Sequence, residues 1–346
     1  MKFSVIIPLY NKTPYVRKAL ESVFAQTYTD YELIVVDDGS TDGSADIAEA
    51  ILQETTPHRP IASSPYRLLK QTNAGVSAAR NSGFAASSGD YVAFLDADDW
   101  WEPTYLERMA QLIADYPDAG LYACNYVYYK PGKTHVALNI PTGYINYPKA
   151  YYESTAMPVW TGAAMIPRKV FDEKGGFPLG IKLGEDFLLW SKIALQYPVA
   201  FLNEPLAWYN NDVPATLRAT RNLHAPEHHM LFRLDEARGL LGYQAIRQEN
   251  GEAETTTPNR PIAQSPYCPT NDDWRRLIDK LRISGIMDYW LDKRYHDQAA
   301  EELKKVDWSK QPASVKRMYK TPIWLLRMKR RVMQVGSWCK QLLIRR

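Results

Sequence analysis

The sequence predicts an α/β fold in which helices cover both faces of a doubly wound, mixed but mainly parallel sheet. Over the first hundred residues, apolar strand-like runs alternate four times with helix-like segments, which is typical of parallel strands joined by crossover helices. Clustered aspartates follow two of these runs and so fall at strand ends. No G-x-G-x-x-G segment follows the first run, which argues against an ordinary dinucleotide-binding dehydrogenase.

The four strands are predicted from short apolar runs that are bounded by turn residues. They are expected at residues 3–8, 31–36, 67–71 and 91–95. After the first strand, Thr13 and Pro14 predict the start of a helix, because proline suits the first helical position. After the second strand, a capping residue within 40–42 should start a helix near Ala45.

Five carboxylates are expected at one edge of this sheet. They are Asp37 and Asp38 after the second strand, and Asp96, Asp98 and Asp99 after the fourth. The carboxyl ends of parallel strands meet at one edge, so these side chains should lie close together, near a topological switch point. Their mutual repulsion calls for a cation or a polar ligand. Because Mg²⁺ and Mn²⁺ combine carboxylates with phosphate oxygens, the pattern predicts a metal–diphosphate site; the alternative is acidic turns that cap helices.

A further acidic pair lies later in the chain. Residues 161–168 are predicted as a strand, and residues 200–209 as the last strand of the domain. Between them, Glu185 and Asp186 open an apolar helix, whose positively polarised start favours carboxylates. An acidic helix start is the simpler interpretation, but the aspartate clusters upstream favour a place in the site.

Four segments in a fixed order carry a resemblance to a known family. They are "SVIIPLYNK", "VVDDGSTDGS", "NAGVSAARNSG" and "YVAFLDADDW". Together they resemble the family 2 glycosyltransferases with the GT-A fold, over about residues 2–210. The resemblance implies a nucleotide-diphosphate-sugar donor, most often a UDP-sugar, a divalent metal (Mg²⁺ or Mn²⁺) and inversion at the anomeric carbon of the sugar.

The resemblance also implies roles for individual residues. The donor-binding residues would be Pro8, Tyr10, Lys12, Asp37, Asp38, Arg80, Asp96 and Glu185. Asp98 would be the principal metal-binding carboxylate, with Asp99 assisting it or holding the acceptor side. Asp186 would be the catalytic base, which takes the proton of the acceptor hydroxyl as that oxygen attacks the sugar.

Other interpretations of some of these residues stay open. Tyr10 could be simple packing, Lys12 a solvated charge and Arg80 an ordinary arginine on a helix surface. The Gln-x-x-Arg-Trp motif of processive family members does not follow Asp186, which favours transfer of a single sugar. Asn210 follows Tyr209 where members often carry a basic residue or a histidine, so a histidine metal ligand is not predicted there.

Two other classes of function remain as alternatives. The pair Asp96 and Asp98 could belong to a metal-dependent phosphohydrolase, although that chemistry usually places its aspartate nucleophile after the first strand. A non-catalytic nucleotide-sugar-binding or membrane-adaptor protein is the third hypothesis, and an intact Asp186 and Asp98 argue against it. Asparagine at these two positions separates the classes, because an enzyme loses turnover whereas an adaptor keeps its role.

The organisation of the chain fits one catalytic domain with an extension. Among 346 residues we expect the GT-A domain at 1–215 and a helical region at 216–346. The three cysteines are too few and too scattered for a disulfide framework or a zinc site. The first strand starts at the N-terminus without a signal peptide, and no run of eighteen apolar residues occurs, so a cytoplasmic location is expected.

The C-terminal tail has its own charge pattern. From Lys316 to Arg346 there are ten Lys and Arg residues and no acid. Within residues 321–346, apolar residues recur at three- and four-residue spacing, which predicts a basic amphipathic helix at an anionic membrane surface. Such a helix would place the enzyme on the inner face of the cytoplasmic membrane, beside lipid-linked or cell-surface glycan acceptors. Packing on the domain is the alternative, and no nucleic acid partner is predicted.

Two proline-rich segments nearly repeat each other. Residues 57–66 and 258–267 are identical at eight of ten positions. Prolines at this density resist helices and central strands, and lengthening a surface loop costs little free energy. We therefore predict inserted loops at 53–66 and 251–270; a duplicated peptide ligand for a partner is the alternative.

Overall fold

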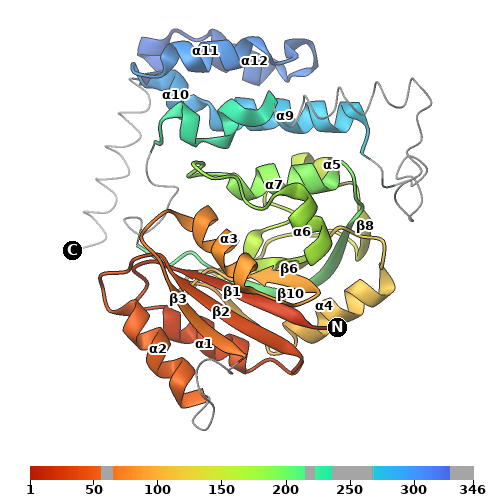
Figure 1. Cartoon of the computed structure of the whole chain (residues 1–346). Coiled ribbons are helices and arrows are strands. Elements are labelled where there is room, and N and C mark those ends of the chain that lie inside the picture. The colour runs from red at the N-terminus through yellow and green to blue at the C-terminus, as the bar shows by residue number, and fades with distance from the viewer. Residues whose placement is uncertain (56–64, 215–222, 236–266, 268, 328–346) are drawn as a thin grey trace. The chain divides into compact units, whose positions relative to one another are not determined.

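The computed structural model describes residues 1–55, 65–214, 223–235, 267 and 269–327. The chain divides into two compact units, Met1–Leu277 and Ile278–Arg346. The first unit contains the sheet and the candidate site (Figure 1). In the described part of the second unit the regular elements are helices.

A mixed sheet forms the centre of the first unit. The strands are β1 (Phe3–Leu9), β2 (Tyr31–Asp37), β3 (Tyr66–Lys70), β4 (Tyr91–Phe94), β5 (Trp100–Trp101), β6 (Leu121–Tyr129), β7 (His135–Val136), β8 (Gly143–Ile145), β9 (Ala164–Pro167) and β10 (Val199–Asn210). Their order is β3-β2-β1-β4-β9-β6-β10-β5, with β7 on β6 and β8 on β10. The longest pairings, β1 with β2 and β6 with β10, are parallel, whereas β9 is antiparallel to both of its neighbours.

The sheet confirms the predicted fold class and shows where its switch point lies. Successive strands run outward from β1 to β2 and β3, and the chain then returns to place β4 on the other side of β1. The loops after β1 and β4 therefore leave the sheet side by side. A doubly wound sheet binds its ligands at such a point, outside the carboxyl ends of the strands.

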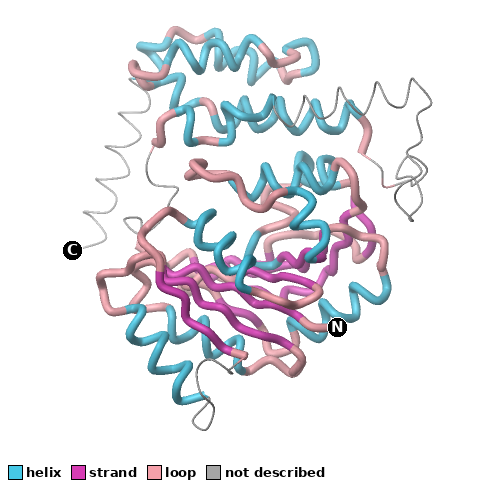
Figure 2. Tube along the Cα trace, in the orientation of Figure 1, coloured by secondary structure: helices cyan, strands magenta, loops and turns pink. Residues whose placement is uncertain are grey.

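Helices cover both faces of the sheet, as the alternating pattern predicts. On one face lie α1 (Val16–Phe24), α2 (Ser44–Thr55) and α4 (Tyr105–Asp115); on the other lie α3 (Val76–Ala86), α6 (Arg168–Lys174) and α7 (Glu185–Ala194) (Figures 1 and 2). A Cβ at Gly83 of α3 would lie 2.4 Å from a methyl carbon of Ile6. This glycine lets α3 pack closely on β1, whose residues are all buried.

Local structure differs from the expectation at two places. The first helix begins at Val16 and not at Pro14, because Thr13 is held in a turn by its bonds to Asp42. In the segment predicted as a strand at 161–168, only Ala164–Pro167 is extended, and Thr161–Ala163 forms a 3₁₀ turn. That turn directs Thr161 away from the ladder and toward the start of α7.

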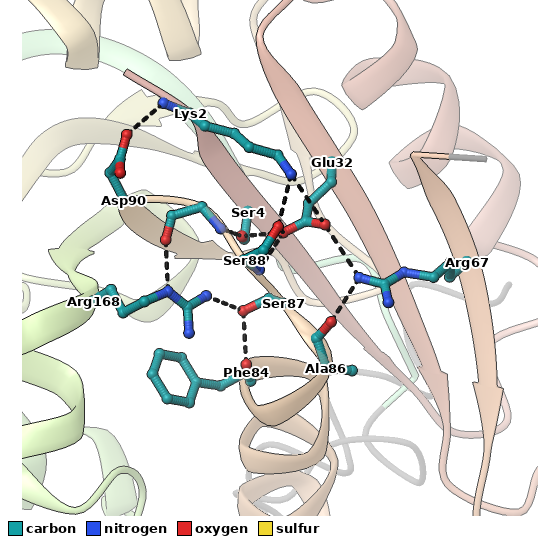
Figure 3. A network of polar contacts seen from close by, with 11 residues as sticks. Lys2, Ser4, Glu32, Arg67, Phe84, Ala86, Ser87, Ser88, Asp90 and Arg168 are labelled. Atoms are coloured by element: carbon teal, nitrogen blue, oxygen red, sulfur yellow. Dashed lines mark hydrogen bonds and ion pairs between the residues drawn. The ribbon is translucent and has the colours of Figure 1, made fainter. Parts of the chain in front are cut away.

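A buried polar network ties the opposite, amino-terminal edge of the sheet together (Figure 3). The carboxylate of Glu32 on β2 accepts hydrogen bonds from Ser4 on β1 at 2.7 Å and from Arg67 on β3 at 3.1 Å. It also accepts bonds from the backbone and the hydroxyl of Ser88, before β4, and forms an ion pair with Lys2. Glu32 thus links β1, β2, β3 and the segment before β4 at the edge away from the predicted site.

Residues 323–327 are helical at the end of the described part of the chain. The remaining labelled helices lie between β8 and that segment. They are α5 (Tyr147–Glu153), α9 (Asn271–Gly285), α10 (Met287–Leu291), α11 (His296–Lys304) and α12 (Ala313–Lys320), with 3₁₀ turns at Pro226–His228, Met230–Arg233 and Trp308–Lys310. In the second unit, the buried Arg282 of α9 donates a hydrogen bond to Glu302 of α11 at 3.1 Å. No helix in the described ranges is long and apolar enough to cross a bilayer.

Some sequence predictions concern residues outside the described ranges. Most of the amphipathic segment at 321–346, namely 328–346, lies outside them, as do residues 56–64 and nearly all of 251–270. The helix α2 runs to Thr55 and β3 begins at Tyr66, so only residues 56–65 connect these two elements.

Candidate active site

The loops after β1 and β2 are tied to each other at the carboxyl edge of the sheet. Asn11 adopts a left-handed backbone conformation with φ 51°, which asparagine tolerates better than most residues. Its side-chain Oδ1 accepts a hydrogen bond from the backbone of Thr41 at 2.9 Å, and its own N–H donates to Ser40. Ser40 in turn donates its backbone N–H to Asp37 Oδ1 at 3.0 Å. Asp37 therefore shapes the turn after β2.

Asp38 anchors the loop that follows β3. Its buried carboxylate accepts hydrogen bonds from the side-chain amide of Gln71 and from the backbone of Ala74, both at 2.8 Å, and from the backbone of Gly75 at 2.9 Å. Gly75 has φ +91°, a conformation that a side chain disfavours. Asp38 thus joins the ends of β2 and β3. If Asp38 contacts the nucleotide base, as the resemblance implies, its carboxylate is already held in place.

Lys12 and Asp98 bridge the switch point. The ammonium of Lys12, after β1, lies 2.5 Å from Asp98 Oδ2, after β4, and both side chains are mostly buried. Burial raises the pKa of Asp98; the charge of Lys12 opposes this rise, and the carboxylate of Asp96 adds to it. Lys12 is therefore not a solvated surface charge, because it sits inside the acidic turn.

Asp99 faces the end of the last strand. Its Oδ1 accepts a hydrogen bond from the backbone of Asn210 at 2.7 Å, and its own N–H donates to the carbonyl of Asp96 at 3.0 Å. Burial, followed by the charges of Asp98 and Asp96, raises the pKa of Asp99 well above the usual range of a carboxyl. Neighbouring carboxylates thus help to raise the pKa of both Asp98 and Asp99, which is the condition that a cation relieves.

Arg80 joins this turn to the start of α7. It is only 3% exposed, so the interpretation as an ordinary surface arginine is wrong. Its Nη2 donates to Asp96 Oδ1 and its Nη1 donates to Glu185 Oε1, both at 2.8 Å. The guanidinium also lies 4.9 Å from the ring centre of Phe177. Arg80 thereby brings the predicted base, the residue after Glu185, to the edge that carries the aspartates.

Asp186 has the surroundings of a general base. It is half-buried; its Oδ1 accepts the backbone N–H of Phe187 at 2.7 Å, and its Oδ2 accepts the hydroxyl of Thr161 at 3.1 Å. Burial raises the pKa of Asp186 to about 6, and Glu185 adds to this rise while Arg80 opposes it. Such a carboxyl is still largely ionised at neutral pH and is a stronger base than an ordinary aspartate.

The remaining predicted donor residues differ in their exposure. Tyr10 is 48% exposed just beyond the end of β1, so the simple packing interpretation is wrong and its ring is open to a ligand. Pro8 is buried within β1, beside Val36 of β2. Pro8 therefore lies within the sheet, just before the carboxyl edge that carries the site.

The structure adds residues that the sequence analysis did not select. Gln71 holds Asp38, Asn210 holds Asp99 and Thr161 holds Asp186. Gln71 could have been found, because it is the polar last residue of a predicted strand. Thr161 gave no such signal, since it lies 25 positions from Asp186 in a segment predicted as a strand.

Comparisons with known proteins identify the family of this chain. Residues 4–175 match the family described as "Glycosyl transferase family 2". The "Putative glycosyltransferase EpsH" of Bacillus subtilis is 37% identical over 305 residues, which cover 82% of each chain. The glycosyltransferase GlyA of Streptococcus pneumoniae is 35% identical over 222 residues, which cover 60% of this chain but only 30% of GlyA.

Solved structures show the same fold. The structure of S. aureus TarS residues 1–349 in complex with UDP-GlcNAc superimposes with a TM-score of 0.59, at 16% identity, over 92% of each chain. The sheet, its switch point and the acidic edge thus define a nucleotide-sugar transferase fold of the GT-A type. The chain belongs to the family 2 glycosyltransferases.

Proposed function

We propose that the protein is an inverting, metal-dependent glycosyltransferase that moves a single sugar from a UDP-sugar to a hydroxyl of a glycan or lipid-linked acceptor. The observation that carries this proposal is the bridge through Arg80, which brings the acidic turn at Asp96 and the base-bearing helix start at Glu185 to one edge. A transferase needs a diphosphate site and a base at the same place. TarS, which shares the fold, was crystallised with UDP-GlcNAc, and this supports UDP as the nucleotide.

The donor would bind across the switch point. Tyr10 is open to the base and ribose, while Asp38 and the loop it anchors form the neighbouring wall. Lys12 stands at the inner end, beside Asp98, where the diphosphate would place its negative charge. Arg80 lies behind Asp96, and we assign it to holding the donor-side carboxylates in position.

The acidic turn fits a divalent cation. Asp98 and Asp99 both have raised pKa values through burial and neighbouring carboxylates, so a positive charge there is favourable. In the described part of the chain no group of three or more His, Cys, Asp or Glu residues is arranged to hold a metal. We assign Asp98, with Asp99 assisting, to hold Mg²⁺ or Mn²⁺, and the donor diphosphate would supply further oxygen ligands. When bound, the cation would neutralise charge on the leaving diphosphate.

The base completes a single displacement. The acceptor oxygen forms a bond to the anomeric carbon as the bond from that carbon to the diphosphate oxygen breaks, and the configuration inverts. Asp186 takes the proton of the attacking hydroxyl. Thr161 and the backbone of Phe187 hold its two oxygens, so the carboxylate is oriented before the acceptor arrives. Peripheral binding through the basic segment 321–346, on the inner face of the cytoplasmic membrane, would bring the enzyme to lipid-linked acceptors.

One panel of measurements tests the proposal. Release of the nucleoside diphosphate and thermal stabilisation would be followed with UDP-, GDP- and dTDP-sugars, in Mn²⁺, Mg²⁺ or chelator. We expect one UDP-sugar to stabilise the protein only with metal, and Asp98→Asn to abolish that effect. Asp172→Asn, an exposed aspartate of α6, is the matched control. Indifference to every nucleotide-sugar, together with hydrolysis of simple phosphate esters, would overturn the proposal in favour of a phosphohydrolase.

A further inference from the structure

We propose that the acceptor subsite beside Asp186 is an aromatic wall that receives the ring of a pyranose sugar. The wall consists of Tyr126, Tyr128, Tyr151, Trp160 and Tyr209. This inference rests on the proposed function, since it names the acceptor class for the same site.

Four of the five rings form one continuous cluster, namely those of Tyr126, Tyr128, Trp160 and Tyr209. Tyr209 packs edge-on against Tyr128 at 5.5 Å and against Trp160 at 5.2 Å between ring centres. Tyr126 lies 5.1 Å from Trp160 and 5.3 Å from Tyr128, and its hydroxyl is 3.2 Å from that of Tyr128. Tyr126 and Trp160 are buried and form the back of the wall, whereas Tyr128, Tyr151 and Tyr209 are half-buried and form its accessible front.

The wall reaches the predicted base from two directions. Trp160 directly precedes Thr161, whose hydroxyl donates to Asp186. Tyr151 of α5 packs edge-on against Phe187, the residue after Asp186, at 5.7 Å. Burial chiefly raises the pKa of Tyr151, and the nearby charges of Asp186 and Tyr128 add to this rise. Tyr151 thus approaches the base from α5, whereas Trp160 does so through Thr161.

A buried polar atom next to this cluster has no partner. Tyr147 stands one turn before Tyr151 on α5 and is 0% exposed. Its hydroxyl makes no hydrogen bond within the described residues, and burial chiefly raises its pKa. Buried hydroxyls are rarely left unpaired, so a ligand or water oxygen is expected beside it.

The wall is separate from the donor side of the site. Its members come from β6, α5, β10 and the residue before the 3₁₀ turn at Thr161–Ala163. The predicted donor residues come from β1, β2, α3, α7 and the loops after β1, β2 and β4. In-line displacement needs the acceptor on the face of the sugar away from the leaving diphosphate. A surface that shares no element with the donor residues suits that requirement.

The chemistry of the wall selects a sugar ring over other acceptors. Aromatic faces pack against the apolar C–H faces of pyranoses, and phenol hydroxyls can both donate to and accept from sugar hydroxyls. None of the five side chains carries a positive charge at neutral pH. The phosphate of a polyprenyl phosphate would have no counter-charge within the wall, which therefore fits the sugar of a glycan or of a lipid-linked saccharide.

The test follows UDP release from the donor that the panel above identifies. Methyl β-glucoside, methyl β-galactoside and methyl N-acetyl-β-glucosaminide would be compared with undecaprenyl phosphate in detergent. We expect at least one pyranoside to accelerate UDP release above the hydrolysis rate, and the lipid phosphate to have no effect. Tyr209→Leu and Tyr128→Leu should each raise the acceptor KM about tenfold, and the donor KM by much less.

The controls separate stacking from structure. Tyr209→Phe and Tyr128→Phe keep the rings and should stay near the wild-type KM. Tyr129→Leu is the matched control, because Tyr129 follows Tyr128 on β6 and points to the opposite face of the sheet.

The possible failures are distinguishable. Donor hydrolysis without acceleration by any pyranoside would overturn the aromatic wall as a sugar site and leave the transferase intact. Acceleration by undecaprenyl phosphate alone, or an equal loss in Tyr129→Leu, would overturn it as well. No donor turnover at all would refute the proposed function, and the inference would fall with it.

Discussion

The guanidinium of Arg80 lies 2.8 Å from the carboxylate of Glu185, although 105 positions separate the two residues. The same guanidinium binds Asp96 through its other terminal nitrogen. A buried cation between two carboxylates joins the two halves of the catalytic unit. The position of the base relative to the acidic turn therefore depends on contacts of Arg80, which is far from Glu185 in the sequence.

Replacement of Arg80 should reduce stability more than it reduces donor affinity. Arg80→Ala leaves Asp96 and Glu185 without their buried partner, so the free energy of unfolding should fall by about 3–5 kcal/mol. Urea denaturation measures this change. Arg80→Lys keeps the charge but cannot contact both carboxylates in the same way. Its free energy of unfolding should therefore fall by part of that amount. Unchanged stability with a raised donor KM would show instead that Arg80 mainly contacts the donor.

Asp186→Asn should abolish transfer while the donor still binds. The amide cannot accept the proton of the acceptor hydroxyl, so kcat should fall by about 10²- to 10⁴-fold. Because Asp186 is assigned to the acceptor side, the Kd of the nucleotide-sugar measured by calorimetry should stay close to that of the wild type. Asp172→Asn serves again as the control, and a similar loss in both variants would remove Asp186 from the base role.

The pH profile should report the raised pKa of Asp186. The ionised form is the base, and burial raises its pKa to about 6. The value of kcat/KM for the acceptor should therefore fall about tenfold for each pH unit below 6 and should level off above pH 6. The profile would be measured with saturating metal and donor over a range in which the protein stays folded.

Thr161 should set the position of that acidic limb. Its hydroxyl donates to Asp186 Oδ2 and so favours the ionised form. Thr161→Val removes this bond and should move the limb upward by up to about one pH unit, whereas Thr161→Ser should leave it in place. A lower kcat in Thr161→Val with an unmoved limb would indicate that Thr161 only supports the local fold.

Glu32 should contribute to the stability of the fold but not to the catalytic activity. Hydrogen bonds from Ser88 and Ser4 and the charge of Lys2 lower the pKa of Glu32 despite its burial (Figure 3). Since its folded pKa lies below its unfolded pKa, this contribution is present above the unfolded pKa and is lost as the pH falls through the folded pKa. Glu32→Gln should cost about 1–3 kcal/mol near neutral pH, and the difference should shrink at acidic pH.

Urea denaturation at several pH values measures the effect of Glu32→Gln. Donor hydrolysis by the variant should match the wild type at temperatures where both are folded, because Glu32 lies at the other edge of the sheet. A pH-independent difference in stability would show that the side chain acts through packing and not through its charge.

The local sequence pattern is enough to predict the sheet and the edge that carries the site. Alternating strand-like and helix-like runs specify parallel strands, and parallel strands place Asp38, Asp98 and their neighbours at one edge whatever else the chain does. The pair Glu185–Asp186 at a helix start also followed from local pattern, because an apolar helix with an acidic first turn is a local property.

Which side chains meet at that edge depends on the tertiary packing. The contacts of Arg80 with Glu185 and of Thr161 with Asp186 join residues 105 and 25 positions apart, and neither hydrophobic periodicity nor spacing carries that information. The aromatic side chains of Tyr128 and Tyr209 likewise meet only because β6 pairs with β10. Local pattern specifies which elements form, whereas the close packing of those elements specifies the partners of each charge and ring.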